Sequence, residues 1–488
     1  MIESSSSKIE TESFRDSLGI VEKSGKRKWV YPKEPKGRFT NARNIFSGIL
    51  LLILFGTPFI SMNGHPFMLF DIIHRKFILF GFAFGPHDFY LLGLSMITSI
   101  VFILLFTAVF GRLFCGWVCP QTVFMESVFR KIDYWVEGDN RIQRRLNESP
   151  WTGEKIFKKG IKYSAYFIIS FLTANMLLAW IIGIPALEIL VTDPVSDHVG
   201  GFTAMMLFTG LFYFIFIWFR EQACILVCPY GRLQGVLLDP NSIVIAYDNL
   251  RGEPRGKIKR NVPRTHGDCI DCNECVTVCP TGIDIRNGTQ LECVNCTACI
   301  DACDTVMDKI KKPRGLIRYD SLNGIKSQTR KIFTTRVIGY SIVQLVLLSL
   351  LTFFLFTRSE IDVTILRTPG MFYQEQQNDN VSNLYDMKVL NKTFEQKDIQ
   401  VKLLNMEGEI RILGDKKDVP PQEVALTKMF VLLHKDAITK MNTPLQFGVY
   451  SNGQEIQRIT TSFLGPVEKK EKREHDDDTH HDKKDEKK

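Results

Sequence analysis

Cysteine is missing from long stretches of this chain, and its distribution narrows the possible chemistry. All 12 cysteines fall in four short motifs, and none occurs after Cys303. The chain beyond Cys303 therefore contains no disulfide bond, and no cysteine remains elsewhere to act as a simple core residue. This usage indicates redox and metal chemistry on the reducing side of a membrane, and it argues against a secreted disulfide framework.

A hydrophobic leader is also missing. Residues 1–42 are polar, rich in serine and then in lysine and arginine, so we expect a cytoplasmic tail and no cleavable signal peptide. The net charge of +8 is concentrated beside apolar segments, as the positive-inside rule requires, and it needs no nucleic acid as a partner. Residues 467–488 are almost entirely charged residues and histidine, which predicts a disordered tail.

Long apolar runs are present and indicate a protein that spans a lipid bilayer several times. Each run is close to the ~20 residues that a membrane helix requires, and they lie at about 44–62, 88–110, 161–183, 201–219 and 332–356. Basic residues such as Arg130, Lys131 and Lys159 follow the second run. We therefore expect a bacterial inner-membrane protein with four spans in residues 43–239 and a fifth in residues 332–356.

Two cysteine runs lie between the fourth and fifth spans, in a segment that we expect to be a cytoplasmic domain of residues 240–325. Each run has the spacing C-x2-C-x2-C-x3-C, which is the pattern of bacterial two-cluster ferredoxins. In that pattern the fourth cysteine of each run reaches the other cluster. The predicted ligand sets for two [4Fe–4S] clusters are Cys269, Cys272, Cys275 and Cys303 for one, and Cys293, Cys296, Cys299 and Cys279 for the other.

Zinc and disulfide interpretations of these runs are weaker. Structural zinc sites usually contain two CxxC pairs rather than two runs of four, and disulfides require an oxidising compartment. One departure from the ferredoxin pattern is Asp304, which follows Cys303 where proline is usual. We expect it to change the local geometry without removing a cluster.

Two further motifs stand where the second and fourth spans end, and they form an internal repeat: Cys115-x3-Cys119-Pro and Cys224-x3-Cys228-Pro. Helical spacing would place both thiols of a pair on one face, with the proline ending or kinking the helix. Four such thiols could bind copper, since thiolates suit Cu(I), or could cycle between dithiol and disulfide. The alternative is a purely structural role at helix ends.

Residues 360–465 show about seven short alternating segments separated by turn residues. They include Asp362–Leu366, Ile399–Leu404 and Met429–Leu433. This pattern predicts a β-sandwich of immunoglobulin type, lying outside the membrane in the periplasm after the fifth span.

The ordered combination of these parts resembles the family of cytochrome c oxidase accessory proteins CcoG/FixG (RdxA) over about residues 25–465. Three segments resemble family signatures: Phe114–Thr122, Cys228–Gln234 and Asp71–Gly81. The resemblance implies a role in assembling a copper-containing oxidase, by reducing Cu(II) to Cu(I). An oxidoreductase of this type would have oxidase subunits or copper-delivery proteins and a cytoplasmic electron donor as partners.

Two other functions remain open. A quinol-dehydrogenase type of membrane polyferredoxin would share the four-span core and the Cys-x3-Cys-Pro motifs, and would pass electrons to a periplasmic reductase. The predicted sandwich after a fifth span favours the oxidase-assembly function over this one. A redox or iron sensor would need an output domain, and the sequence predicts none.

Overall fold

The computed structural model describes residues 26–62, 64–72, 75–258, 266–329, 331–376, 379–414, 418–438 and 440–466. The predicted disorder at residues 467–488 and most of the predicted N-terminal tail lie outside these ranges. The chain divides into two units, Met1–Thr357 and Arg358–Lys488.

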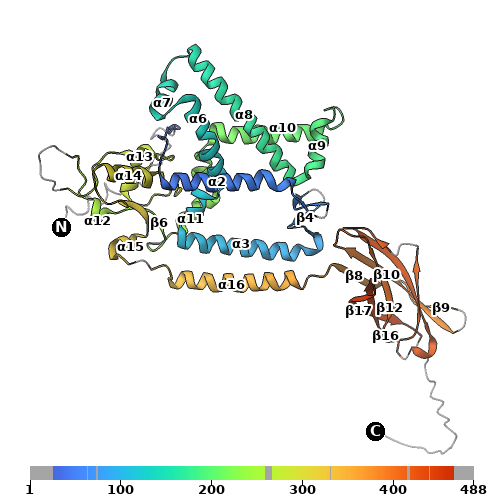
Figure 1. Ribbon diagram of the computed structural model, residues 1–488. Coiled ribbons are helices and arrows are strands. Elements are labelled where there is room, and N and C mark those ends of the chain that lie inside the picture. The colour runs from blue at the N-terminus through green and yellow to red at the C-terminus, as the bar shows by residue number, and fades with distance from the viewer. Residues whose placement is uncertain are drawn as a thin grey trace, which may run out of the picture. The chain divides into compact units, whose positions relative to one another are not determined.

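In the described part of the first unit, five helical segments are long and apolar enough to cross a bilayer. They are α2 (Arg38–Gly56) with η2 (Thr57–Phe59), η3 (Pro86–Asp88) with α3 (Phe89–Phe110), α8 (Gly153–Ile182), α10 (Val199–Phe214) with the π-helical turn η5 (Ile215–Phe219), and α16 (Thr335–Phe356). Helix α3 packs along α16, and α10 packs along α8 (Figure 1). Large apolar side chains such as Leu52, Leu207 and Leu345 point outward, as they do in a helix bundle surrounded by lipid.

Ordered structure also fills the connections between spans. The segment between α2 and α3 forms two small sheets, β1 (Ser61–Met62) with β2 (His65–Pro66), and β3 (Met68–Asp71), β4 (Lys76–Leu79) and β5 (Phe82–Phe84). Strand β3 packs on α8, where Phe70 stacks on Trp180 with ring centroids 5.9 Å apart. A short helix, α9 (Ile184–Thr192), follows α8.

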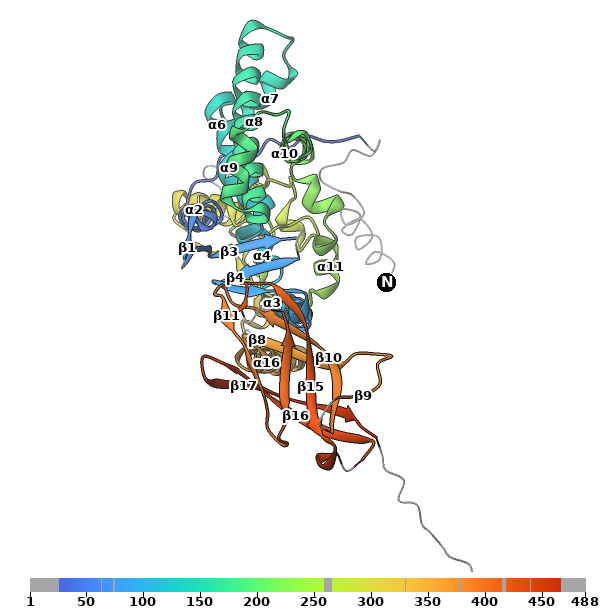
Figure 2. The ribbon, with the colours of Figure 1, turned by 90° about the vertical axis from the view of Figure 1, so that its right-hand side faces the viewer.

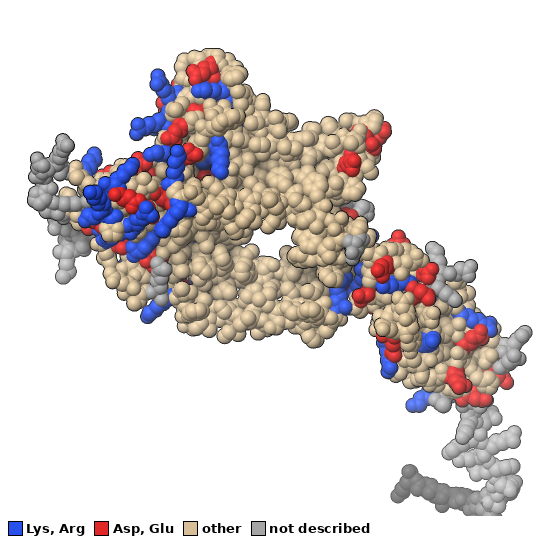
Figure 3. Space-filling view, in the orientation of Figure 1, with Lys and Arg blue, Asp and Glu red and all other residues tan. Residues whose placement is uncertain are grey.

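The segment with the two cysteine runs forms a small domain beside one end of the helices. Strand β6 (Val244–Tyr247) pairs with β7 (Ile317–Asp320) and joins the two ends of this segment. Between them lie α12 (Asn249–Gly252), α13 (Glu274–Thr277), η7 (Ile285–Asn287) and α14 (Ala298–Lys309). Figure 3 shows Lys and Arg gathered around this domain and the adjacent helix ends, whereas the spans are almost free of charge.

Helix α14 links the cysteine domain to the first span. It continues past Cys303 to Lys309, which proline at position 304 would hinder. Its Asp301 carboxylate accepts hydrogen bonds from the backbone N–H groups of Phe39 (3.1 Å) and Thr40 (2.7 Å). Helix α2 begins at these residues without a side-chain cap of its own, so a residue of the cysteine domain supplies the N-terminal cap of α2.

The second unit is a sandwich of two antiparallel sheets. One has the order β13 (Glu409–Leu413), β15 (Val424–His434), β10 (Asn380–Asn391) and β8 (Ile361–Arg367), and β9 (Gln374–Glu375) pairs with β10. The other contains β12 (Gln400–Leu403), β16 (Asn442–Ser451) and β17 (Gln454–Leu464). Their inner faces bury Tyr385, Val431 and Phe447 completely, so an apolar core holds the sandwich without a disulfide. Figure 2 shows the two sheets of this unit.

Candidate cluster and thiol sites

Two cavities in the small domain are lined by cysteine. Cys269, Cys272, Cys275 and Cys303 line the first. Cys279, Cys293, Cys296 and Cys299 line the second, and Cys275 reaches its wall. The chain thus groups the thiols as the ferredoxin spacing predicts, with the fourth cysteine of each run crossing to the other group. The assignment of each group as the ligands of one cluster remains a prediction.

The two cysteine loops repeat the same backbone conformation. Asp271 and Asn273 have φ of 52° and 59°, and the equivalent residues Asn295 and Thr297 have φ of 53° and 68°. Asn and Asp tolerate this left-handed region better than most residues. These turns wind the first three cysteines of each run around one side of a cavity.

The thiols fit an iron–sulfur cube better than a single ion. Burial raises the pKa of Cys275, Cys293 and Cys303 to about 12, so these thiols keep their protons unless a metal displaces them. Among the described residues, no three His, Cys, Asp or Glu side chains are grouped to hold one metal ion. A [4Fe–4S] cube instead takes one cysteine at each of four separated iron atoms, and it supplies one-electron transfer.

One arginine with little exposed side chain stands beside each cavity; the side chains of Arg286 and Arg43 are 7% and 5% exposed. Arg286 lines the first cavity and bonds Asp284 (2.8 Å) and Asp271 (2.6 Å). Arg43, from the first span, donates to the Cys296 carbonyl oxygen at 2.8 Å beside the second. Positive charge near a cluster is one of the factors that set its potential. Sequence reasoning missed both residues, because Arg43 directly precedes the apolar run at about 44–62 and looks there like one more basic residue flanking a span.

The Cys-x3-Cys-Pro motifs do not place two thiols on one helix face, so that expectation is wrong. Cys115 lies in α4 (Leu113–Trp117), and Cys119 has extended ψ of 124° and precedes α5 (Pro120–Phe124). Cys224 lies in the π-helical turn η6 (Ala223–Val227), and Cys228 precedes α11 (Pro229–Leu237). Each proline is the first residue of a new helix, a position that it favours, so each thiol pair straddles a helix break.

The internal repeat extends to the backbone before each motif. Gly111, four residues before Cys115, has φ 55° and ψ −133°. Arg220, four residues before Cys224, has φ 49° and ψ −122°. Gly111 and Arg220 each end a span with the same sharp turn. Glycine adopts this backbone conformation without strain, whereas a residue with a side chain, such as Arg220, is strained in it.

The two motifs contact each other. The Phe114 ring meets the Tyr230 ring edge-on at 6.0 Å, and the Cys115 thiol bonds the Gln234 amide oxygen at 3.2 Å. Helix α11 of the second motif therefore packs closely on α4 of the first. Within the second motif, a Cβ at Gly231 would lie 2.6 Å from the Cys224 carbonyl oxygen, so α11 also packs on η6. Burial raises the pKa of Cys115 and of Cys224 to about 12.

Both motifs also contact the second cysteine cavity. A Cβ at Gly116 would lie 2.5 Å from the Val294 carbonyl oxygen, and Trp117 donates from its ring N–H to the Tyr319 hydroxyl at 3.1 Å. That hydroxyl donates to the Asn295 carbonyl oxygen at 3.2 Å. A further cavity is shared by Cys224, Pro280 and Val294. The four thiols of the Cys-x3-Cys-Pro motifs, called the membrane-edge thiols, are therefore neighbours of the second cysteine group, which is Cys279, Cys293, Cys296 and Cys299.

A buried ionic network supports the ends of the third and fourth spans. Arg130, in α6 (Arg130–Glu137), bonds Glu126 at 2.9 Å and also pairs with Glu221. Burial alone would raise the pKa of the Asp133 carboxyl, but Arg220 and Lys162 outweigh it and lower the pKa to about 2. These groups therefore remain charged, and each charge is paired.

Comparison with family models identifies two kinds of domain in this chain. A 4Fe–4S dicluster domain matches residues 219–322, and a 4Fe–4S binding domain matches residues 92–139. The model for the immunoglobulin-like fold at the C-terminus of FixG matches residues 351–466.

Curated relatives cover most of the chain. Protein RdxA of Cereibacter sphaeroides is 34% identical over 380 residues, covering 75% of this chain and 80% of RdxA. The nitrogen fixation protein FixG of Rhizobium meliloti is 30% identical over 459 residues, covering 84% of this chain and 87% of FixG. The ferredoxin-type protein NapH of Escherichia coli is 28% identical over 212 residues, but these cover only 38% of this chain and 64% of NapH.

Proposed function

This chain belongs to the FixG/RdxA family of membrane iron–sulfur electron-transfer proteins, and from that premise we propose that it reduces Cu(II) to Cu(I) during assembly of a cytochrome c oxidase. One electron is needed for each copper ion, and the [4Fe–4S] clusters supply one-electron transfer when bound. Cu(II) is the substrate in this proposal, and Cu(I) is the product delivered to oxidase subunits or to copper-delivery proteins.

The observation that carries the proposal is the packing of the Cys-x3-Cys-Pro motifs on the second cysteine group. Gly116, between Cys115 and Trp117, leaves no room for a side chain against Val294 and Asn295. Soft thiols are suitable ligands for Cu(I), and because no three of Cys115, Cys119, Cys224 and Cys228 are grouped around one point in the described part of the chain, the proposed copper would take two of them. Copper held there would lie beside the loop that carries Cys293 and Cys296, where an electron needs to cross only a short gap.

The proposed orientation places the cysteine domain in the cytoplasm of a bacterial inner membrane and the sandwich in the periplasm. The basic residues around the cysteine domain support this orientation by the positive-inside rule (Figure 3). The proposed donor is therefore a cytoplasmic reductant that reaches the group of Cys269, Cys272, Cys275 and Cys303. In this proposal the cytoplasmic domain comprises residues 240–325 and the periplasmic sandwich comprises residues 360–465.

A quinol-dehydrogenase polyferredoxin is the second candidate, supported by the likeness to NapH. That likeness covers 38% of this chain, whereas the FixG-type sandwich matches residues 351–466. The sandwich therefore favours the first candidate.

A deletion strain separates the two candidates. Under limiting copper, we expect low oxidase copper and little assembled oxidase, with partial recovery when copper is added and full recovery when the chain is restored. Normal oxidase together with lost quinol oxidation would contradict the copper proposal and support the quinol-dehydrogenase candidate.

A further inference from the structure

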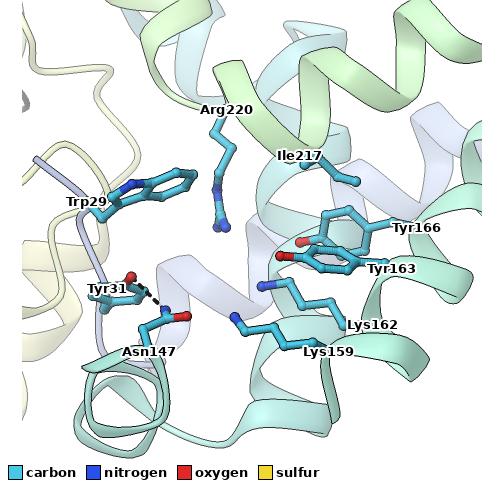
Figure 4. Close-up of a pocket in the computed structure, with 9 residues that line it drawn as sticks. All are labelled: Trp29, Tyr31, Asn147, Lys159, Lys162, Tyr163, Tyr166, Ile217 and Arg220. Carbon is cyan, nitrogen blue, oxygen red and sulfur yellow. Dashed lines mark hydrogen bonds between the residues drawn. The ribbon is translucent and has the colours of Figure 1, made fainter. Parts of the chain in front are cut away.

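A cavity of about 320 Å³ lies between the segment before α2 and the ends of the third and fourth spans. The lining residues are Trp29, Tyr31, Asn147, Lys159, Lys162, Tyr163, Tyr166, Ile217 and Arg220. Figure 4 shows the Lys159 and Lys162 amines and the Arg220 guanidinium directed toward a shared space, with aromatic rings on both sides of it. Neither the cysteine groups nor the proposed copper route uses this cavity.

Among the described residues, the lining carries three cations and no carboxylate. The side chains of Lys159, Lys162 and Arg220 are 10%, 8% and 9% exposed. Their carboxylate partners do not line the cavity: Glu137 is 2.7 Å from Lys159 and 3.2 Å from Lys162, Asp133 is 2.8 Å from Lys162 and 2.9 Å from Arg220, and Glu221 is 3.8 Å from Arg220. An ammonium has three N–H donors and a guanidinium five, so these ion pairs hold the cations in place without using all of their donors.

Arg220 is kept in this position against its backbone preference. Its φ is 49°, and the equivalent residue of the first Cys-x3-Cys-Pro copy, with φ of 55°, is Gly111. This conformation costs about 1–3 kcal/mol for a residue with a side chain. Glycine at 220 would remove the strain but also the guanidinium on the cavity wall. The guanidinium pairs with Asp133 (2.9 Å) and Glu221 (3.8 Å), so the arginine serves the ionic network and also supplies a cation to the cavity wall.

The position of the cavity indicates a ligand from the membrane. Helix α8 has 30 residues and so measures about 45 Å, longer than the ~30 Å hydrocarbon core. Lys159 and Lys162 lie in its first turns, near the polar surface of the bilayer. Nearby Phe157, Phe167 and Trp218 expose 69%, 45% and 47% of their surface, and such apolar surface suits acyl chains.

We propose that this cavity binds the phosphate group of an anionic phospholipid. Lys159, Lys162 and Arg220 bind the phosphate through charge-assisted hydrogen bonds, and Trp29 and Tyr31 cover the headgroup. The acyl chains lie along the exposed apolar faces of α8 and η5. Basic pockets between membrane helices are established binding sites for such headgroups. A bound lipid would join the segment before the first span to the third and fourth spans.

Thermal unfolding of the purified, delipidated full-length protein in neutral detergent micelles tests this proposal. Separate samples receive phosphatidylglycerol, phosphatidylcholine or inorganic phosphate, and tryptophan fluorescence reports unfolding. We expect phosphatidylglycerol alone to raise the midpoint, because a ligand that binds only the folded state stabilises it. Equal protection by inorganic phosphate would show a free-anion site, and protection by phosphatidylcholine would show nonspecific lipid binding. Either result would overturn the proposal.

Two variants and one matched control localise the effect. Lys159→Gln removes a lining cation, and Asn147→Asp adds a negative charge to the wall while keeping the size of the side chain. Each should weaken phosphatidylglycerol binding about tenfold, the equivalent of one charge-assisted hydrogen bond. Lys158→Gln makes the same charge change one residue away, at a side chain that pairs with Glu154 and does not line the cavity. If all three variants respond to phosphatidylglycerol as the unmodified protein does, the lipid binds elsewhere.

Discussion

Gly116 faces Asn295 so closely that a Cβ at residue 116 would lie 2.6 Å from the Asn295 carbonyl oxygen. This contact joins the first Cys-x3-Cys-Pro motif to the loop between Cys293 and Cys296. It is backbone against backbone, so no flexible side chain can move aside to make room. The distance between the membrane-edge thiols and the second cysteine group therefore depends on glycine at this position.

Gly116→Ala should push the motif away from the loop, at a cost of about 1–3 kcal/mol in stability. We expect the iron content to remain normal and the rate of Cu(II) reduction to fall severalfold. Iron analysis and a colorimetric Cu(I) assay on the purified protein measure both. Gly93→Ala is the matched control, because a Cβ there meets nothing within 4 Å. Unchanged copper reduction in Gly116→Ala would show that this contact is not part of the electron route.

Asp301→Asn should destabilise the junction between α14 and α2. The carboxylate accepts from two backbone N–H groups and from the Thr40 hydroxyl (2.7 Å), and loss of a capping group costs about 1 kcal/mol. The midpoint for thermal loss of cluster absorbance should fall by a few degrees. Asp308→Asn, at an exposed carboxylate of the same helix, should leave the midpoint nearly unchanged. Equal midpoints for the two variants would argue against the cap.

Asp133→Asn should destabilise the protein strongly at neutral pH and much less in acid. The variant removes the buried carboxylate that Arg220 and Lys162 share and leaves them only Glu221 (3.8 Å) and Glu137 (3.2 Å), and breaking such a buried pair costs about 3–5 kcal/mol. The pKa of Asp133 is lowered from 3.8 to about 2, so its stabilising effect is complete above about pH 4 and is lost as the pH falls through 2. Denaturant unfolding at pH 7 and near pH 2 measures the difference in unfolding free energy between the unmodified protein and the variant. A difference that stays constant over this range would contradict the assigned charge of Asp133.

The ferredoxin spacing predicts how the chain groups its thiols, because the spacing of ligands along a chain limits how they can surround a cube. The five spans and the sandwich follow equally directly from apolar length and from period-two alternation. The Cys-x3-Cys-Pro geometry could not be predicted in the same way. Spacing of four residues suggests one helix face, but proline at the next position starts a new helix, and the chain turns at Cys119 and at Cys228.

Long-range contacts were also beyond the sequence. Asp301 and Thr40, or Gly116 and Asn295, are far apart in the chain, and no local pattern relates them. The hydrogen bond from Arg43 to the Cys296 carbonyl oxygen and the cationic cavity at Arg220 likewise arise only from the way that the spans pack. Sequence motifs identify the chemistry in this protein, whereas tertiary packing decides which groups are neighbours.

The most direct test of the central claim follows Cu(II) reduction by the chemically reduced, purified protein after removal of excess reductant. The unmodified protein should contain about eight iron atoms. It should form Cu(I) while its clusters are reoxidised, which the return of the cluster absorbance reports. A variant with serine at Cys115, Cys119, Cys224 and Cys228 should keep its iron and its cluster absorbance but lose most Cu(I) formation. Full Cu(I) formation by this variant would contradict the account. Loss of about four iron atoms would also contradict it, because these thiols would then hold a cluster rather than the copper substrate.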